Sequence, residues 1–335
     1  MPRTKIKTGK DKRHDKIKIS DLSDKLIRSI QEITLASDKD SIDLINSAIA
    51  SREVTNDIDD LENWCDNHLA KKTIIVSETD EEYFDIVHSA LLSLPTQFSM
   101  GIGNQKRGPI KMIGDKVGGY SVEFAVKKLA RIIGVEIGLA HQIGEVAQFI
   151  NSDFPSVFEG GKWRKSKINV GAKSGKKNSL WMDVPTSQFQ NTDYQIFGRC
   201  VTNGDHLENC AMMDLLNNPN LRNRHYPESF LKYKKGLARK PMSVYLVGFA
   251  AKPISKSFTY KGYKARKIFH ITEMAGVIPS DYEDVVRKKE NLPANFKIEI
   301  LCIERFQKHK GSFCAWNSGS IIKTREQIDE LIRKL

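Results

Sequence analysis

The chain has 335 residues, of which 40% are apolar, and its 53 Lys and Arg against 41 Asp and Glu give a net charge of +12. This composition predicts a folded protein with a sizeable core, and its clustered positive excess favours a polyanionic partner over an acidic small substrate. No apolar run approaches the roughly 18 residues that span a bilayer, and the basic start lacks the apolar stretch of a signal peptide. We therefore expect a cytoplasmic protein with no membrane partner.

The first 95 residues divide into a basic arm and a helical part. Residues 1–18 are rich in Lys and Arg and almost without large apolar side chains, which predicts a disordered arm. Apolar side chains then recur at helical spacing from Leu22 to Ile33, with Ser20 as the expected cap. Further helices are predicted at about 40–52 and 57–70, a strand at 72–76, and a helix over 78–94 that stops at Pro95. We interpret 19–95 as a helical subdomain, with a role in dimerisation, in DNA contact or in structure alone.

Six glycines between Gln97 and Tyr120 surround several cations, among them Lys106 and Arg107, ahead of an apolar helix predicted at 121–133. Glycine lets backbone amides approach a phosphate closely, and the following helix N-terminus favours an anion. A nucleotide cradle is one interpretation, but the G-x-x-x-x-G-K-[ST] pattern of a P-loop is absent. A loop on a DNA backbone is the better functional interpretation, and a turn-rich connector is the structural alternative.

The stretch Gly114–Lys128 (GDKVGGYSVEFAVKK) is similar to the Gly-Asp-x-x-Gly-Gly segment that opens a central helix in several type II restriction endonucleases. It departs from their pattern after Gly119, where Tyr120–Glu123 replaces an Arg-Asn. The resemblance implies sequence-specific cleavage of unmethylated double-stranded DNA by metal-dependent hydrolysis, with Mg²⁺ as cofactor, by a homodimer that reads a palindrome.

Two later segments concentrate positive charge. Gly160–Met182 holds seven cations and no acid around Trp163, which either stacks on a base or packs under its own loop. Ser229–Thr272 runs 44 residues without an acid and carries eleven Lys or Arg, on strands predicted at 242–251 and 260–274 that form a hairpin. A solvated hairpin is the alternative to a nucleic-acid surface. The expected DNA contacts are Lys106, Arg107, Lys162, Arg164, Lys165, Lys167, Lys261, Lys264, Arg266 and Lys267.

These patterns predict an α+β fold, in which a helical N-terminal part precedes a mainly antiparallel, strongly basic sheet from about 160 to 304. The predicted divisions are a basic disordered arm (1–18), a helical subdomain (19–95) and an α+β DNA-binding and catalytic domain (96–335). Five widely spaced cysteines without a C-x-x-C pair argue against a zinc ribbon or a disulfide framework.

The metal ligands stay unassigned at this point. Most restriction nucleases place an Asp and an Asp/Glu-x-Lys triplet on adjacent strands, because two carboxylates hold Mg²⁺ and the Lys positions the attacking water. The sequence offers no clean example: Asp115, Asp183, Asp193, Glu299 and Glu304 do not start the required triplet.

A second resemblance explains the missing triplet. His270 and Glu273 in FHITEM, together with Tyr120, are similar in residue type to restriction DNA glycosylases, which are β-rich and work without metal. This resemblance implies that Tyr120 orients or stacks on the sugar, that His270 transfers a proton, and that Glu273 holds the imidazole or stabilises charge on the ribose. The chain is then a glycosylase and AP lyase. A structural His270, and a DNA-binding protein without catalysis, are the remaining alternatives.

Overall fold

The computed structural model describes residues 22–99, 109–140, 152–185, 188, 191–202, 204–208, 240–252, 268–272, 287–288, 291, 300–304 and 312–335, some of them by backbone alone. The fold is α+β, as the sequence predicts, with helices packed on mixed sheets. Its helices are α1 (Asp24–Thr34), α2 (Asp38–Ala50), α3 (Ile58–Trp64), a π-helical segment (Cys65–Leu69), α4 (Ala70–Lys72), α5 (Glu81–Ser99), α6 (Pro109–Ile132), α13 (Ser318–Ile321) and α14 (Arg325–Arg333).

The described strands form three sheets. The first has the order β1 (Thr73–Val76), β8 (Met242–Ala251), β7 (Tyr194–Cys200) and β5 (Val170–Lys176). The second has the order β6 (Trp181–Pro185), β11 (Ser312–Asn317), β10 (Ile300–Glu304) and β9 (Ile268–Thr272). The third contains β2 (Glu136–Gly138), β3 (Ser156–Glu159) and β4 (Lys162–Lys165). The pairs β5–β7 and β9–β10 are parallel, so the sheets are mixed.

The hairpin expected between 242–251 and 260–274 is wrong for the parts that the structure describes. β8 pairs with β1 and β7 in the first sheet, whereas β9 pairs with β10 in the second. Both interpretations of this segment, a nucleic-acid surface and a solvated hairpin, need an exposed hairpin, but β8 is buried along nearly its whole length. A strand that is buried on both faces reads as a continuous apolar run, and Met242–Ala251 is such a run.

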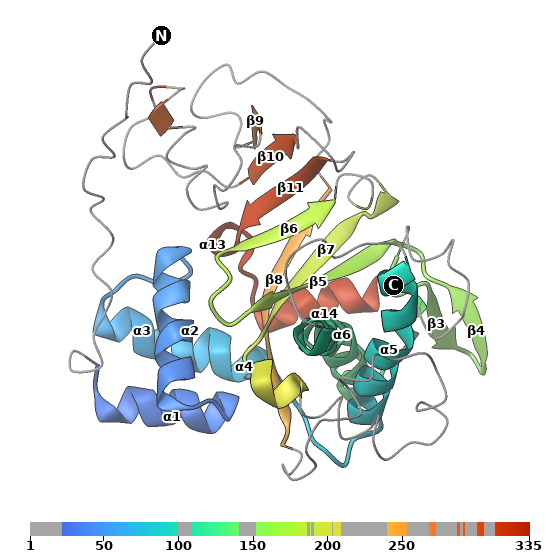
Figure 1. Cartoon of the computed structure of the whole chain (residues 1–335), viewed down its shortest axis with the longest axis horizontal. Coiled ribbons are helices and arrows are strands. Elements are labelled where there is room, and N and C mark those ends of the chain that lie inside the picture. The colour runs from blue at the N-terminus through green and yellow to red at the C-terminus, as the bar shows by residue number, and fades with distance from the viewer. Residues whose placement is uncertain are drawn as a thin grey trace.

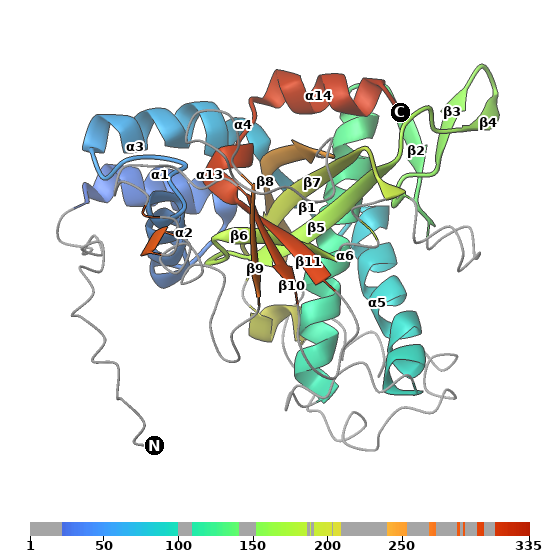
Figure 2. The ribbon, with the colours of Figure 1, turned by 90° about the horizontal axis from the view of Figure 1, so that it is seen from above.

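The first sheet is covered on both faces, as Figures 1 and 2 show. Val244 and Leu246 of β8 point into a core shared with α5, α6 and α14, whereas Tyr245 and Val247 point into a second core shared with α1, α2 and α3. This alternation follows from the two-residue period of a strand. The result is a layered body with β5 at one edge of its sheet.

Two helix boundaries differ from the sequence prediction. The cap of α1 is Ser23, whose hydroxyl accepts from the Leu26 amide at 3.2 Å, and Ser20 lies outside the described residues. α5 continues through Pro95 to Ser99 and so crosses the boundary expected at 95. A proline removes one helical hydrogen bond and need not end the helix.

The glycines of Gly114–Tyr120 lie inside α6 and do not form the expected loop there. They let the helix approach its neighbours closely. A methyl group at Gly114 would lie 2.7 Å from Glu208 Cγ, and one at Gly118 would lie 3.4 Å from a Leu207 methyl. The segment resembling restriction nucleases is therefore a packed central helix that lies across β5 and β7.

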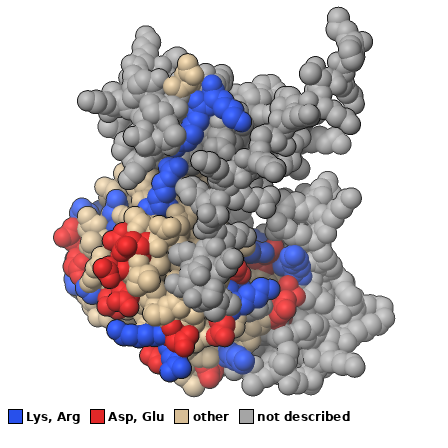
Figure 3. Space-filling view, turned by 90° about the vertical axis from the view of Figure 1, so that its left-hand side faces the viewer, with Lys and Arg blue, Asp and Glu red and all other residues tan. Residues whose placement is uncertain are grey.

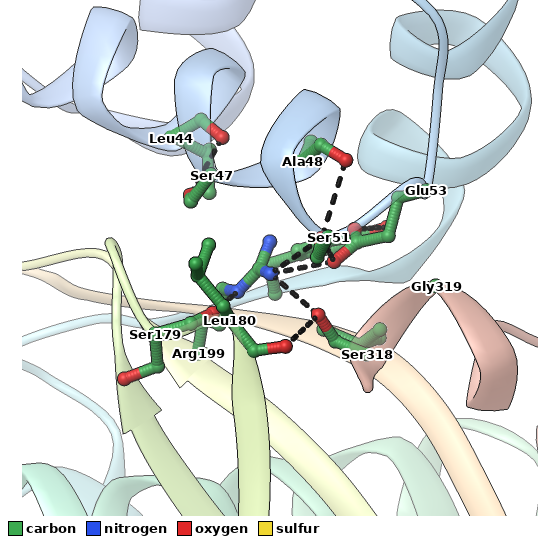
Figure 4. Close-up of polar contacts among 12 residues, drawn as sticks. Leu44, Ser47, Ala48, Ser51, Glu53, Ser179, Leu180, Arg199, Ser318 and Gly319 are labelled. Carbon is green, nitrogen blue, oxygen red and sulfur yellow. Dashed lines mark hydrogen bonds and ion pairs between the residues drawn. The ribbon is translucent and has the colours of Figure 1, made fainter. Parts of the chain in front are cut away.

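A buried polar network joins the N-terminal helices to the first sheet (Figure 4). Arg199 of β7 pairs with Glu53, which follows α2, and also donates to Ser179 O at 2.9 Å and to the Ser318 hydroxyl at 2.9 Å. Lys72 donates to two backbone carbonyls and lies over the ring of Tyr245, 5.1 Å from its centroid. The network fixes where the helices sit on the sheet.

The face formed by the N-terminal helices mixes both signs of charge. In Figure 3, Lys and Arg side chains are interspersed with Asp and Glu over this side of the molecule. Asp59, Asp60 and Asp66 are exposed on or beside α3. This face therefore lacks the excess of cations that phosphate binding needs. Within the described ranges, no helix has both the length and the apolar character to cross a membrane.

Candidate functional site

Five ionisable side chains gather where α6 meets the edge strand β5. Lys116, Tyr120 and Glu123 lie at successive turns along one side of α6, because residues three and four apart share a helix face. Lys173 lies on β5, and Asp153 lies in the segment just before β3. The charges of Lys116, Glu123, Asp153 and Lys173 change the pKa of one another or of Tyr120, so the five side chains form one electrostatic unit.

Backbone contacts hold Asp153 beside the start of β5. Its N–H donates to Val170 O at 2.9 Å, and its carboxylate oxygen Oδ2 accepts from the Ala172 N–H at 2.6 Å. The Ser152 hydroxyl makes two further bonds with Val170, at 3.0 and 3.1 Å. Asp153 is 9% exposed. One carboxylate oxygen is therefore bound to the strand that carries Lys173, which sets the orientation of the carboxyl group.

Lys173 lies between two carboxylates. Burial lowers the pKa of its ammonium group, while Asp153 and then Glu123 raise it. A cation that is removed from water needs such partners, because the desolvation penalty otherwise neutralises it. Lys173 is half-buried, so its surroundings still communicate with solvent.

Glu123 is the most strongly shifted carboxyl of the cluster. Burial raises its pKa from 4.5 to about 7, and Lys173 and Lys116 oppose that rise. Burial also lowers the pKa of Lys116 and raises that of Tyr120. Strongly shifted groups that depend on one another and lie in a partly open place are typical of functional sites.

Tyr120 is the one expected catalytic residue whose side chain the structure describes. It is half-buried, and its hydroxyl interacts with Ser93 of α5 and with the charge of Glu123. Glu273 lies outside the described residues, and His270 is described only by its backbone, on β9 opposite Cys302. The structure therefore places Tyr120 in the cluster and does not test whether His270 and Glu273 join it.

The expected DNA contacts divide into three groups. Lys162, Lys165 and Lys167 are exposed on or beside the β3–β4 hairpin. Arg164 already has internal partners, because it pairs with Glu159 and donates to Leu335 O at 3.0 Å, so its role is partly structural. The remaining expected contacts lie outside the described residues: Lys106, Arg107, Lys261, Lys264, Arg266 and Lys267.

No local sequence pattern singles out Asp153, Lys173 or Glu123 for a role in this cluster. Asp153 lies before β3, and β5 begins with Val170-Gly171-Ala172-Lys173, so Gly171 stands where the Asp/Glu-x-Lys triplet would have its acid. A search for the triplet passes over this segment. The second carboxylate that acts on Lys173 belongs to Glu123 of α6. A pattern of an Asp followed by a strand that carries a Lys, with the second acid anywhere in the chain, includes Asp153 and Lys173.

The donor set suits a small hard cation. Mg²⁺ commonly binds through one or two carboxylates, several waters and substrate phosphate oxygens. Asp153 and Glu123 supply two carboxylates, and the neighbouring cations suit a phosphate. Among the described residues, no group of three or more His, Cys, Asp and Glu gathers as a closed metal site. Two carboxylates would fill only part of the octahedral shell of Mg²⁺, and water or a phosphate would have to supply the remaining ligands.

A cavity of about 530 Å³ lies elsewhere, in the N-terminal helical part. Arg52, Glu53, Asp60 and His68 are among its lining residues, and none of the five cluster residues lines it. The Glu53 carboxylate in its wall is already bound to Arg199 and Tyr245. The chemistry therefore points to the cluster and not to the cavity.

Comparisons with protein-family models, with curated proteins and with solved structures found no match.

Proposed function

We propose that the chain is a restriction-type endonuclease that hydrolyses double-stranded DNA with Mg²⁺, at the cluster of Glu123, Asp153 and Lys173. One observation carries the proposal: Asp153 and Glu123, from different parts of the chain, both raise the pKa of the Lys173 ammonium group. Lys173 itself lies on the edge strand β5. This is the residue set that the chemistry of metal-dependent nucleases requires. The net charge of +12 supports a polyanionic substrate.

Each residue has a distinct task in this proposal. Asp153 and Glu123 would hold the cation, and Asp153 is the better oriented of the two because its Oδ2 is fixed by the Ala172 N–H. Bound Mg²⁺ supplies a Lewis acid that lowers the pKa of its water and stabilises the leaving oxygen. Lys173 holds the attacking water against the phosphate. Hydrolysis adds that water across one P–O bond, which gives a phosphate monoester and a hydroxyl group.

Lys116 and Tyr120 line the same side of α6 and extend the site. The half-buried ammonium group of Lys116 lies close enough to Glu123 to alter its pKa, and a phosphate oxygen is the anion that would suit it once a cation has engaged the carboxylates. Tyr120 presents a hydroxyl and a ring beside them. The same Tyr120 is where the glycosylase alternative would begin, so an experiment must separate the two chemistries.

The proposed partners follow from the substrate. Duplex DNA would lie along the exposed Lys162, Lys165 and Lys167, on the hairpin that continues from Asp153. A homodimer would bring two such clusters to the two strands of a palindrome.

The test is cleavage of unmethylated plasmid and genomic DNA with and without EDTA. We expect Mg²⁺-dependent fragments, and a loss of rate of about 10²- to 10⁴-fold in Lys173→Ala and Asp153→Asn. Lys176→Ala is the matched control, because Lys176 is exposed on the same strand and pairs with Asp115 at 2.8 Å. It should cleave at the wild-type rate.

Other outcomes identify the alternatives. Cleavage that persists in EDTA, leaves heat-labile abasic sites and is lost in Tyr120→Phe would overturn the hydrolytic proposal in favour of base excision. DNA binding without any cleavage, over several metals and sequences, would leave a non-catalytic DNA-binding protein.

A further inference from the structure

The β3–β4 hairpin carries an exposed aromatic pair. Phe158 and Trp163 oppose each other in the strand register, and their rings pack edge to face with centroids 5.4 Å apart. Trp163 is 51% exposed and Phe158 is 39% exposed. Trp64, Trp181 and Trp316, the other three of the four tryptophans, are buried. Two adjacent exposed rings form a contiguous apolar patch, and such patches rimmed by polar residues mark interaction sites.

The hairpin has one face for the core and one for solvent. Val157 of β3 and Ile137 of β2 are buried on the inner face. Phe158 and Trp163 lie on the outer face, where a methyl group at Gly138 would be 3.4 Å from the Trp163 ring. The same methyl group would collide with Ser156 Oγ, so the missing side chain at Gly138 makes room chiefly for Ser156, with the indole beside it.

The hairpin is held rigid from behind. Arg164, on the inner face, pairs with Glu159 and donates to Leu335 O at 3.0 Å, and the Lys167 N–H donates to the same oxygen at 2.6 Å. The turn consists of Gly160 and Gly161, both with positive φ (60° and 80°), which suits a two-residue hairpin loop. An aromatic pair on a braced hairpin loses little conformational freedom on binding.

Charge around the pair selects the partner. Lys165 lies on the aromatic face opposite Ser156, Lys162 adjoins the turn, and Lys167 follows the hairpin; all three are exposed. Glu136 is the exposed acid opposite Phe158. Aromatic rings among cations are the means by which proteins stack on bases while phosphates are neutralised. In Figures 1 and 2 the hairpin projects from the edge of the molecule, where a duplex can reach it.

We infer that Trp163, supported by Phe158, is an aromatic wedge that stacks on a base step of the bound DNA duplex. This inference rests on the proposed function for its substrate. Phe158 follows Asp153 by five residues, a span of at most about 17 Å along an extended chain, or about five base-pair steps. The wedge therefore contacts the duplex close to the cleaved phosphodiester, and it unstacks the DNA there.

Trp163 is its own probe, because the other tryptophans are buried. Titration of the inactive variant Lys173→Ala with duplex DNA should quench the exposed tryptophan emission and protect it from acrylamide. Trp163→Phe should abolish both signals while DNA affinity is retained. Trp163→Ala should weaken duplex binding by about 5- to 100-fold, the range for loss of one base–aromatic stack. In duplexes that carry 2-aminopurine at successive positions, the fluorescence of that base should rise at one step when Trp163→Phe binds. It should not rise when Trp163→Ala binds.

Several results would overturn the inference. Wild-type affinity in Trp163→Ala, with native circular dichroism, would show that the indole does not contact DNA. Protection of Trp163 that needs no DNA and rises with protein concentration would assign the face to a second copy of the chain. Protection by single strands alone would exclude a duplex. If DNA protects Trp163 but is not cleaved, the nuclease proposal fails and the wedge stands. If DNA is cleaved and Trp163→Ala binds it with wild-type affinity, the nuclease proposal stands and the wedge fails.

Discussion

Glu53 and Arg199 form an ion pair in which both side chains are fully buried, with 2.5 Å between Arg199 Nη2 and Glu53 Oε1. Glu53 follows α2 and Arg199 lies on β7, so the pair joins the helical part to the sheet (Figure 4). Removing one partner leaves the other charge buried and unpaired, which costs about 3–5 kcal/mol.

We therefore expect Arg199→Met to lower the free energy of unfolding by about 3–5 kcal/mol, measured by urea denaturation. Glu53→Gln/Arg199→Met should lose less than the sum of the two single variants, because no unpaired charge remains. Additive losses would show that the two charges do not depend on each other.

Lys72 makes stability depend on pH. Its side chain is buried, and burial lowers the pKa of its ammonium group from 10.5 to about 7, although Glu53 opposes this. Between pH 7 and 10.5 the unfolded chain binds this proton and the folded protein does not, so stability rises with pH across that window. Relative to Lys72→Met, the wild type should gain up to about 1.4 kcal/mol per pH unit from pH 7.5 to 9. Equal slopes in the two proteins would contradict the lowered pKa.

The sequence predicted the elements that have a strong local signal. The periodicity of Leu22–Ile33 identified α1, and the apolar runs at 72–76 and 242–251 identified β1 and β8. The sequence did not predict the features that depend on packing between residues far apart in the chain. The glycines of α6 read as a loop because their neighbours across the helix, Leu207 and Glu208, are distant in the sequence.

The candidate site was hidden for the same reason. Glu123, Asp153 and Lys173 come from three separate elements, and no short spacing joins them. The resemblance to restriction glycosylases points to Tyr120, which lies in the cluster, whereas no local pattern marks Asp153 or Lys173 as catalytic. Charge counting identified Lys162, Arg164, Lys165 and Lys167 as one group, although Arg164 is turned to Glu159 and Leu335. The partner of a cation cannot be read from its neighbours along the chain.

Gly171 leaves space that Gln195 fills. A methyl group at Gly171 would lie 2.6 Å from Gln195 Nε2, and that nitrogen donates to the Thr192 hydroxyl at 2.6 Å. Gly171→Ala must displace the amide, and we expect a loss of about 1–3 kcal/mol from overpacking. Gly171→Ala/Gln195→Ala should be less destabilised than the two single changes predict. Thermal unfolding measures both, and an undisturbed Gly171→Ala would contradict the close contact.

Arg164 and its neighbouring lysines should affect DNA binding differently. Each of Lys162→Ala, Lys165→Ala and Lys167→Ala should reduce the slope of log affinity against log salt by about 1, because one phosphate contact is lost. Arg164→Ala should leave the slope nearly unchanged and lower thermal stability, because its partners Glu159 and Leu335 lie within the protein. Fluorescence anisotropy between about 50 and 200 mM salt measures the slopes. Equal slopes for all four variants would place Arg164 on the DNA.

We expect the carboxylate of Glu123 to lower the free energy of unfolding at neutral pH. Its pKa is about 7 in the folded protein against 4.5 ordinarily, chiefly through burial. Between these values the folded state binds more protons than the unfolded chain, so stability falls as pH rises from about 4.5 to 7 and stays lower above that range. Glu123→Gln has no carboxylate to ionise and avoids this loss.

We therefore expect Glu123→Gln, measured in EDTA, to melt a few degrees above the wild type at pH 8, since 1 kcal/mol moves Tm by about 2–4 °C in a chain somewhat smaller than this one. The difference should shrink toward pH 5, where the wild-type carboxyl is protonated. Glu330→Gln, on the exposed side of α14, is the control and should show no such trend. A variant that is more stable than the wild type and yet fails to cleave DNA would identify Glu123 as a residue kept for chemistry, because a structural carboxylate would lower stability on removal. A Glu123→Gln protein that melts below the wild type at pH 8 would instead assign it to the core.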